Sequence, residues 1–104
     1  MSFYSWTQDL PIDADAYADI VGRMGSAAMP GLVVHVAIET VEGRMHYLDV
    51  WESEEQHDKA FGSVVHPAVG PVLAQRGIQV AGEPPRTPIK VVDVRFADGT
   101  SIRG

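Results

Sequence analysis

The chain has no cysteine among its 104 residues. Disulfides, thiolate nucleophiles and sulfur-ligated zinc or iron sites are therefore excluded, so stability has to come from packing, with or without help from a second subunit. Basic residues are also few, eight Lys and Arg against fourteen Asp and Glu, for a net charge of -6. A net negative charge is unsuited to a surface that replaces counterions along a phosphate backbone, so we expect no nucleic-acid partner.

Long apolar runs are absent as well, since none approaches the roughly 18 residues of a membrane span. Residues 1–10 have no basic patch followed by an apolar stretch. We therefore expect no membrane association and, by default, a cytoplasmic protein. An apolar fraction of 45% and a charged fraction of 21% are ordinary for a folded chain. The length favours a single domain, residues 1–104, with one modest core.

The first half of the chain predicts a strand, a helix and a hairpin. Alternating aromatic residues predict a strand over residues 3–8. An aspartate cap followed by apolar residues spaced i, i+3, i+4 and i+7 predicts a helix over Asp13–Met24, whose apolar stripe is Tyr17, Ile20, Val21 and Met24. Residues 32–40 and 44–51 are rich in β-branched and aromatic side chains, and the short connection between them ends in Gly43. These two segments form the clearest hairpin in the sequence.

The second helix is predicted from its cap. Ser53 and Gln56 form a capping box, so this helix begins directly after the hairpin. We expect Pro67 to interrupt it. A shorter helical piece follows over residues 69–75, with Gly77 as its cap.

The remaining segments complete a recognisable order of elements. Residues 82–88 hold three prolines and predict an extended connector, 89–96 predict the last strand, and 97–104 a turn with a loose tail. The order is then βαββαβ. It predicts an α+β, ferredoxin-like fold, in which a four-stranded antiparallel sheet carries two helices on one face.

The turn type fixes which residues of the hairpin face each other. With Gly43 in the left-handed conformation after a type I turn, His35 lies opposite Asp49 and Val33 opposite Trp51, whereas a two-residue turn would shift this register by one. In the first register, alternation separates two faces. One face carries Val34, Val36, Ile38, Leu48 and Val50, and the other carries His35, Ala37, Tyr47, Asp49 and Trp51.

Both faces of the predicted sheet are too apolar for one of them to face water. Trp6, Tyr47 and Trp51, together with the valines, suggest that a second copy of the chain covers the face that the helices leave open, or its edge. We therefore expect a homodimer.

Three stretches resemble a known family: Gly31–Ala37 (GLVVHVA), Asp49–Glu55 (DVWESEE), and Phe61 with His66–Pro67. They are similar to small dimeric α+β barrel proteins, in particular the antibiotic biosynthesis monooxygenase-like group. The likeness spans about a third to half of the chain, and its most diagnostic part is the tryptophan that closes the third strand before Glu-Ser-Glu-Glu. It implies a ferredoxin-like fold, a homodimer and a small hydrophobic or aromatic ligand. The superfamily includes cofactor-free oxygenases of polyketide quinols, haem-degrading enzymes, cyclising enzymes and members without known activity.

His35 and Asp49 are the candidate catalytic pair. A carboxylate opposite His35 would fix the imidazole tautomer and stabilise its protonated form, so that His35 could act as a general base. The resemblance implies that a phenol or quinol deprotonated in this way reacts directly with oxygen. The alternative is a buried structural contact that fixes the strand register or the dimer seam, in a non-catalytic ligand-binding or dimerisation module.

Three further residues are candidates for substrate binding. Tyr47 and Trp51 could stack on a planar ligand and donate hydrogen bonds to its oxygens. The alternative is that both are core aromatics without a ligand role. The resemblance implies that Trp51 lies in the pocket wall and that His57 or His66 is the histidine near it. Haem-degrading relatives combine asparagine, tryptophan and histidine, and this chain has no asparagine. No glycine-rich phosphate loop, HExxH motif or carboxylate–histidine cluster is present, so no cofactor and no metal are expected.

Overall fold

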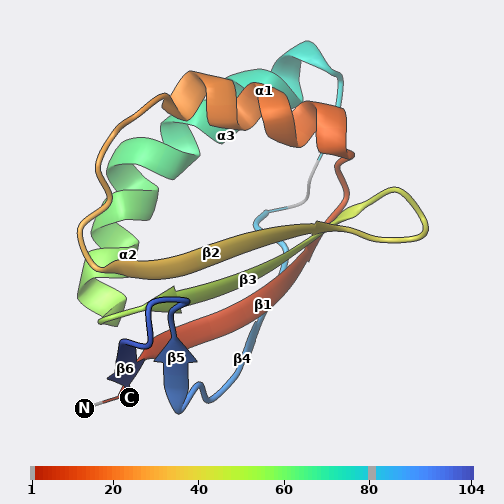
Figure 1. The fold of residues 1–104 in the computed structure, drawn as a ribbon. Coiled ribbons are helices and arrows are strands. Elements are labelled where there is room, and N and C mark those ends of the chain that lie inside the picture. The colour runs from red at the N-terminus through yellow and green to blue at the C-terminus, as the bar shows by residue number, and fades with distance from the viewer. Residues whose placement is uncertain (1, 80–81) are drawn as a thin grey trace.

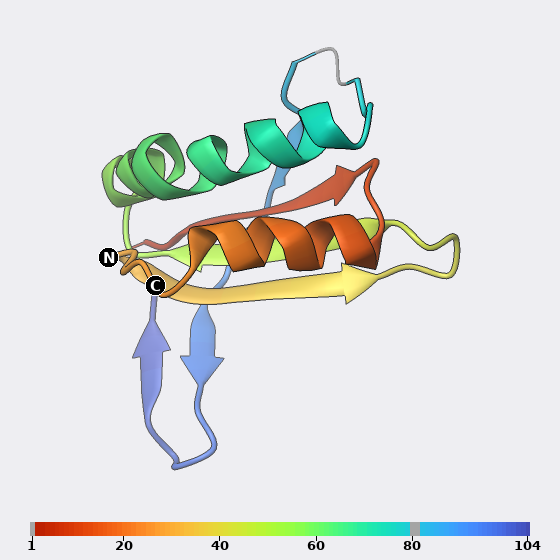
Figure 2. The same cartoon turned by 90° about the horizontal axis from the view of Figure 1, so that it is seen from above.

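The computed structural model describes residues 2–79 and 82–104. Its main sheet is antiparallel and four-stranded, in the order β2-β3-β1-β4. The helices α1 and α3 lie side by side over one face of this sheet, and the other face is left uncovered by helices (Figures 1 and 2). The predicted α+β, ferredoxin-like fold is therefore confirmed. The bounds of its strands and helices are β1 Tyr4–Leu10, α1 Ala14–Met24, β2 Leu32–Glu39, β3 Met45–Trp51, α2 Glu54–Ala60, α3 His66–Gln75 and β4 Arg86–Pro88.

The caps predicted from sequence are present. The Asp13 carboxylate accepts a hydrogen bond from the Ala16 N–H, and the Ser53 hydroxyl accepts one from the Gln56 N–H. Both satisfy a donor that the first helical turn leaves free. At the far end of α3, the Ile78 N–H donates to the Leu73 carbonyl at 3.0 Å, and Gly77 follows the last turn.

The β2–β3 hairpin has the three-residue turn predicted from Gly43, whose φ is +78°. The Thr40 N–H donates to the Arg44 carbonyl, and His35 pairs with Asp49. The predicted pairing of Val33 with Trp51 is wrong, because a bulge at Val33 brings Leu32 opposite Trp51. A bulge places two residues of one strand against one of the other, which absorbs the shift without changing the register near the turn.

The second helix continues past the point where the sequence predicted an interruption. A π-helical turn, Phe61–Val65, joins α2 directly to α3, and Pro67 lies in the first turn of α3. Proline has no N–H and crowds the carbonyl four residues earlier. The wider turn before Pro67 accommodates both constraints, since π-helical turns insert readily into α-helices.

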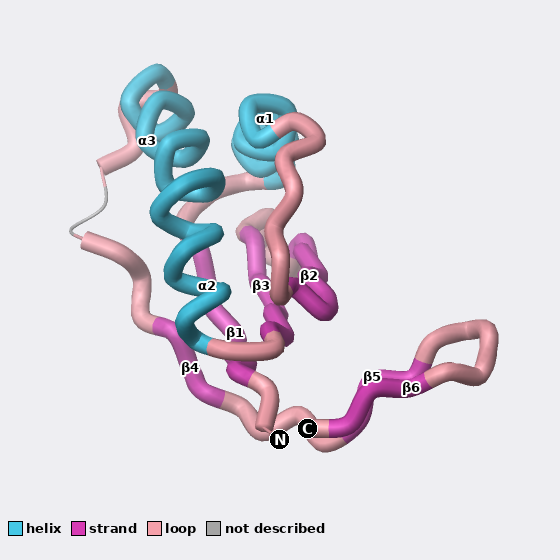
Figure 3. The backbone as a smooth tube through the Cα atoms, turned by 90° about the vertical axis from the view of Figure 1, so that its left-hand side faces the viewer, coloured by secondary structure: helices cyan, strands magenta, loops and turns pink. Residues whose placement is uncertain are grey.

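The prediction that residues 89–96 form the last strand of the main sheet is wrong. The strand that completes the sheet is β4, Arg86–Pro88, which pairs with β1 at the sheet edge. Prolines suggested a connector here, but an edge strand tolerates proline because one side of its backbone needs no partner. Residues beyond it form a separate two-stranded hairpin, β5 Asp93–Arg95 with β6 Ser101–Arg103, which projects away from the sheet (Figure 3).

The turn between β5 and β6 repeats the geometry of the first hairpin. The Phe96 N–H donates to the Thr100 carbonyl at 2.8 Å, and Gly99 has φ +92°. The Asp98 carboxylate also accepts from the Thr100 N–H. The segment predicted as a loose tail therefore contains the strand β6. The sequence signal for this hairpin was the Asp98–Gly99 pair, which begins three residues after the end of β5.

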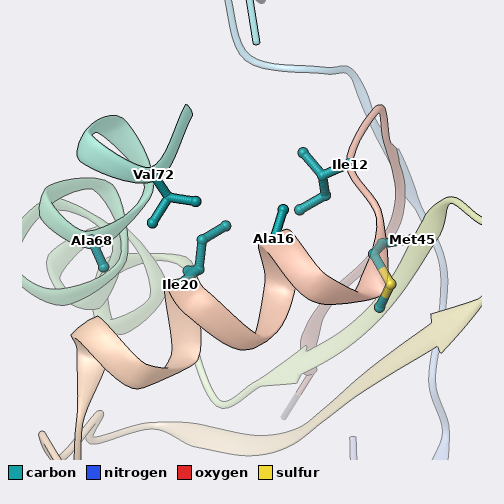
Figure 4. Close-up of a cluster of buried hydrophobic side chains, with 6 residues drawn as sticks. All are labelled: Ile12, Ala16, Ile20, Met45, Ala68 and Val72. Carbon is teal, nitrogen blue, oxygen red and sulfur yellow. The ribbon is translucent and has the colours of Figure 1, made fainter. Parts of the chain in front are cut away.

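The apolar core lies where α1 and α3 meet the end of the sheet near the first hairpin. Its fully buried members come from the β1–α1 loop, α1, β3 and α3 (Figure 4). They are Ile12, Ala16, Ile20, Met45, Ala68 and Val72. A second, aromatic cluster of Trp6, Trp51, Ala60 and Phe61 lies toward α2.

The aromatic side chains occupy the opposite sheet face from the one on which the dimer prediction placed them. Trp6 and Trp51 are buried in the aromatic cluster against α2, and Tyr47 packs against both clusters on the helix-covered face. On the uncovered face, alternation places Val36 and Ile38, which are 40% and 44% exposed. The exposed apolar residues of the uncovered face are therefore aliphatic.

Candidate active site

A cavity of about 350 Å³ lies between the sheet and the helices. Residues of β1, α1, β2, β3 and α3 line it, together with the segment Gly82–Pro84. Its walls are almost entirely apolar, and its volume falls in the range of small-molecule sites. Four predicted site residues, His35, Asp49, Tyr47 and Trp51, are in the lining.

His35 and Asp49 form the strongest polar contact in this cavity. The His35 Nδ1 lies 2.5 Å from Asp49 Oδ1, and Asp49 is 2% exposed. A carboxylate only accepts hydrogen bonds, so Nδ1 carries the proton and donates. The other imidazole nitrogen, Nε2, therefore has a free lone pair when the ring is neutral.

Trp51 supplies the second hydrogen bond to the Asp49 carboxylate. Its indole Nε1–H donates to Asp49 Oδ2 at 2.9 Å, so each carboxylate oxygen has one donor. This contact holds the plane of the Asp49 carboxylate, and through it the orientation of the His35 ring. Trp51 thus belongs to the candidate site through its indole N–H as well as through its ring.

Tyr17 of α1 joins the pair, although sequence analysis assigned it only to the apolar stripe of the helix. Its hydroxyl lies 2.9 Å from His35 Nε2, so the O–H donates to the free lone pair. Burial, followed by the negative charge of Asp49, raises the pKa of Tyr17, which keeps this hydroxyl protonated. The available signal was a polar tip on an otherwise apolar helix face.

Tyr47 stands beside this group as a wall of the cavity. Its ring centroid is 5.1 Å from that of His35 and 5.5 Å from that of Tyr17, both edge-on. Burial raises the pKa of Tyr47, and the neighbouring Tyr17 and Asp49 raise it further. Tyr47 is therefore a neutral phenol, able to contact a planar ligand and to donate a hydrogen bond to it.

His57, the third predicted binding residue, does not line the cavity. It is 1% exposed, its Nε2 accepts from the Trp6 indole N–H at 3.1 Å, and its Nδ1 contacts Asp58. Its ring stacks on Phe61 with centroids 4.2 Å apart. In this structure His57 organises the aromatic cluster behind Trp51.

A buried glutamine was missed by sequence analysis. Gln8 is 4% exposed, lies in the cavity lining, and donates from Nε2 to the Pro84 carbonyl at 2.7 Å. This bond fastens the segment Gly82–Pro84 to β1. The signal was its place on the same strand face as Trp6.

Comparison with solved structures supports the family resemblance. The chain is similar to a crystal structure from Chloroflexus aurantiacus J-10-fl described as a "putative Antibiotic biosynthesis monooxygenase". The two share 26% sequence identity and a TM-score of 0.52, over 85% of this chain and 93% of that one. This similarity supports the antibiotic biosynthesis monooxygenase-like dimeric α+β barrel superfamily.

Two other comparisons add nothing to this superfamily assignment. No family model matches the chain, and no curated protein matches it. Within residues 2–79 and 82–104, no helix is long and apolar enough to cross a membrane. The same residues hold no group of three or more side chains that could bind a metal ion.

Proposed function

We propose that the protein is a cofactor-independent monooxygenase-like enzyme that oxidises a small hydrophobic hydroxyaromatic or polyketide-like molecule, with His35 as the base. The observation that carries this proposal is the hydrogen-bond chain at the wall of an apolar cavity. The buried Asp49 carboxylate orients His35 so that its proton-accepting nitrogen is turned away from the carboxylate. Trp51 and Tyr47 support the ligand as aromatic walls.

The proposed reaction needs only the substrate and dioxygen. His35 takes the proton when the phenolic O–H bond breaks, and the resulting phenolate is electron-rich enough to give an electron to dioxygen. The two radicals combine, forming a C–O bond at the carbon para to the phenolate oxygen, and the proton on His35 returns to the peroxide. Loss of water then breaks the O–O bond and the para C–H bond. One phenol and one dioxygen thus give one quinone and one water.

The test is oxygen uptake by the purified protein with a panel of quinols and phenols, measured beside His35→Ala and Asp49→Asn. Uptake that depends on both residues supports the proposal. Uptake that persists in both variants, or its absence with every substrate, contradicts it and favours a structural role for the His–Asp contact.

We also propose that the protein works as a homodimer. The uncovered sheet face exposes Val36 and Ile38, and the projecting β5–β6 hairpin exposes Phe96 and Ile102, each 41%. A two-stranded hairpin is marginally stable in water unless it packs against something else. A second copy, seated on the uncovered face, would bury both groups at once.

Substitution of Ile38 by aspartate is expected to convert the dimer to a monomer, because it places a charge in the buried seam. Light scattering after size-exclusion chromatography measures this mass. The matched control is Val41→Asp at the tip of the first hairpin, where the side chain is fully exposed and the dimer is retained. A monomeric wild-type protein would contradict the proposal.

A further inference from the structure

The hydrogen bonds of His35 determine how a substrate reaches the base. The nitrogen of His35 that can accept a proton is Nε2, because Nδ1 is committed to Asp49. Nε2 is itself occupied by the Tyr17 hydroxyl at 2.9 Å. A substrate hydroxyl that enters the cavity therefore meets Tyr17 before it meets the lone pair of His35.

Tyr17 is held in this position from several sides. It lies in the first turn of α1, between the buried residues Ala16 and Ile20 that anchor the helix to the core. Its ring is nearly parallel to that of His35, with an angle of 19° and centroids 6.1 Å apart. Tyr17 also lines the cavity, so its oxygen can contact both a ligand and His35.

We propose that Tyr17 is a catalytic residue that relays the substrate proton to His35. The proposal rests on the function proposed above, and it deepens that function by naming the group that touches the substrate hydroxyl. The Tyr17 oxygen accepts the substrate proton while its own proton passes to His35 Nε2. One substrate O–H bond and the Tyr17 O–H bond break, a new Tyr17 O–H bond and an Nε2–H bond form, and no electrons change hands.

After the transfer, the positive charge on His35 lies beside the negative charge of Asp49. Tyr17 is neutral again, the substrate is a phenolate, and the His35 imidazolium is paired with the buried Asp49 carboxylate. The raised pKa of Tyr17 disfavours a standing tyrosinate, so its gain and loss of a proton have to be concerted. The relay also restricts the ligand class, because it requires a ligand with an acidic proton within hydrogen-bond distance of the Tyr17 oxygen.

The competing mechanism makes Tyr17 a cap on the base. In that case Tyr17 swings away, the substrate contacts Nε2 directly, and removal of the Tyr17 hydroxyl frees the base. The two mechanisms predict opposite results for Tyr17→Phe, which keeps the ring and removes only the oxygen. The relay predicts loss of proton transfer, and the cap predicts retained or faster transfer.

The experiment uses 4-nitrophenol as the probe, because its visible absorbance reports its protonation state. It is performed without oxygen, at a pH one unit below the pKa of the free probe, so that no oxidation is required. Wild type, Tyr17→Phe and His35→Ala are titrated with the probe. Tyr4→Phe is the matched control, since Tyr4 packs on His57 with centroids 4.9 Å apart and does not line the cavity.

The relay predicts that wild type and Tyr4→Phe bind the probe as phenolate. Tyr17→Phe and His35→Ala are expected to bind it with an affinity within about threefold of wild type, yet with at least about tenfold less phenolate among the bound molecules. Ionisation retained in Tyr17→Phe but lost in His35→Ala would overturn the relay and leave His35 as the base. A wild-type protein that fails to bind or ionise the probe, or ionisation that persists in His35→Ala, would overturn the proposed function and the relay together.

Discussion

His35→Ala is expected to lower kcat for oxidation of a hydroxyaromatic substrate by about 10²–10⁴-fold, the usual contribution of a positioned general base. The substitution removes the imidazole whose Nε2 is the proton acceptor of the hydrogen-bond chain. Its partner Asp49 is buried and would be left with one donor, from Trp51. The substrate would then have to lose its proton to water inside an apolar cavity.

The chain offers a matched control for this substitution. His46 also lies on β3 and also contacts a carboxylate, with Nδ1 2.7 Å from Asp9, but Asp9 is exposed and neither residue lines the cavity. His46→Ala is expected to keep wild-type kcat. Asp49→Asn is expected to lower kcat by at least about tenfold, because it removes the charge that stabilises the imidazolium. A His35→Ala variant as active as His46→Ala would contradict the assignment.

Trp51→Ala is expected to lower the free energy of unfolding by about 3–5 kcal/mol, the range for truncating a large buried aromatic side chain. Trp51 is 1% exposed and packs edge-on against His57 and Phe61. Its loss would leave a cavity in the aromatic cluster and remove a donor from Asp49. A domain of this size has only about 5–15 kcal/mol of stability in total, so the variant would be close to unfolding.

Urea denaturation followed by circular dichroism measures this loss, with all proteins at one protomer concentration because the proposed dimer would add to stability. Trp51→Phe separates packing from hydrogen bonding. It keeps an aromatic ring and leaves Asp49 Oδ2 without its donor, and is expected to cost about 1–3 kcal/mol. Val41→Ala, at a fully exposed position, is expected to change stability by less than about 0.5 kcal/mol. A loss below about 1 kcal/mol in Trp51→Ala would show that the ring is not a core element.

Local chemistry accounts for what the sequence predicted well. The Asp13 and Ser53 caps satisfy donors a few residues away, and the left-handed conformation at Gly43 sets the register of the hairpin. That register alone places His35 opposite Asp49. Two of the four side chains in the hydrogen-bond chain could therefore be paired without any tertiary information.

The missed features depend on packing between elements that are distant in sequence. The approach of Tyr17 to His35 depends on how α1 sits on the sheet, which the apolar stripe of the helix specifies only broadly. The strand at Arg86–Pro88 exists because the free edge of β1 accepts it, against the local preference of proline. The β5–β6 turn was predictable, since Asp98 and Gly99 carry the same signal as Glu42 and Gly43.

The most direct test of the central claim is the fate of isotopic oxygen during turnover. The protein, freed of metal by a chelator and given no added cofactor, is supplied with ¹⁸O₂ and a phenol that it consumes and that carries hydrogen on the para carbon, and the products are analysed by mass spectrometry. The mechanism predicts one labelled oxygen atom in each quinone and the other in water. A product without label, or turnover that requires an added metal or flavin, would contradict the account.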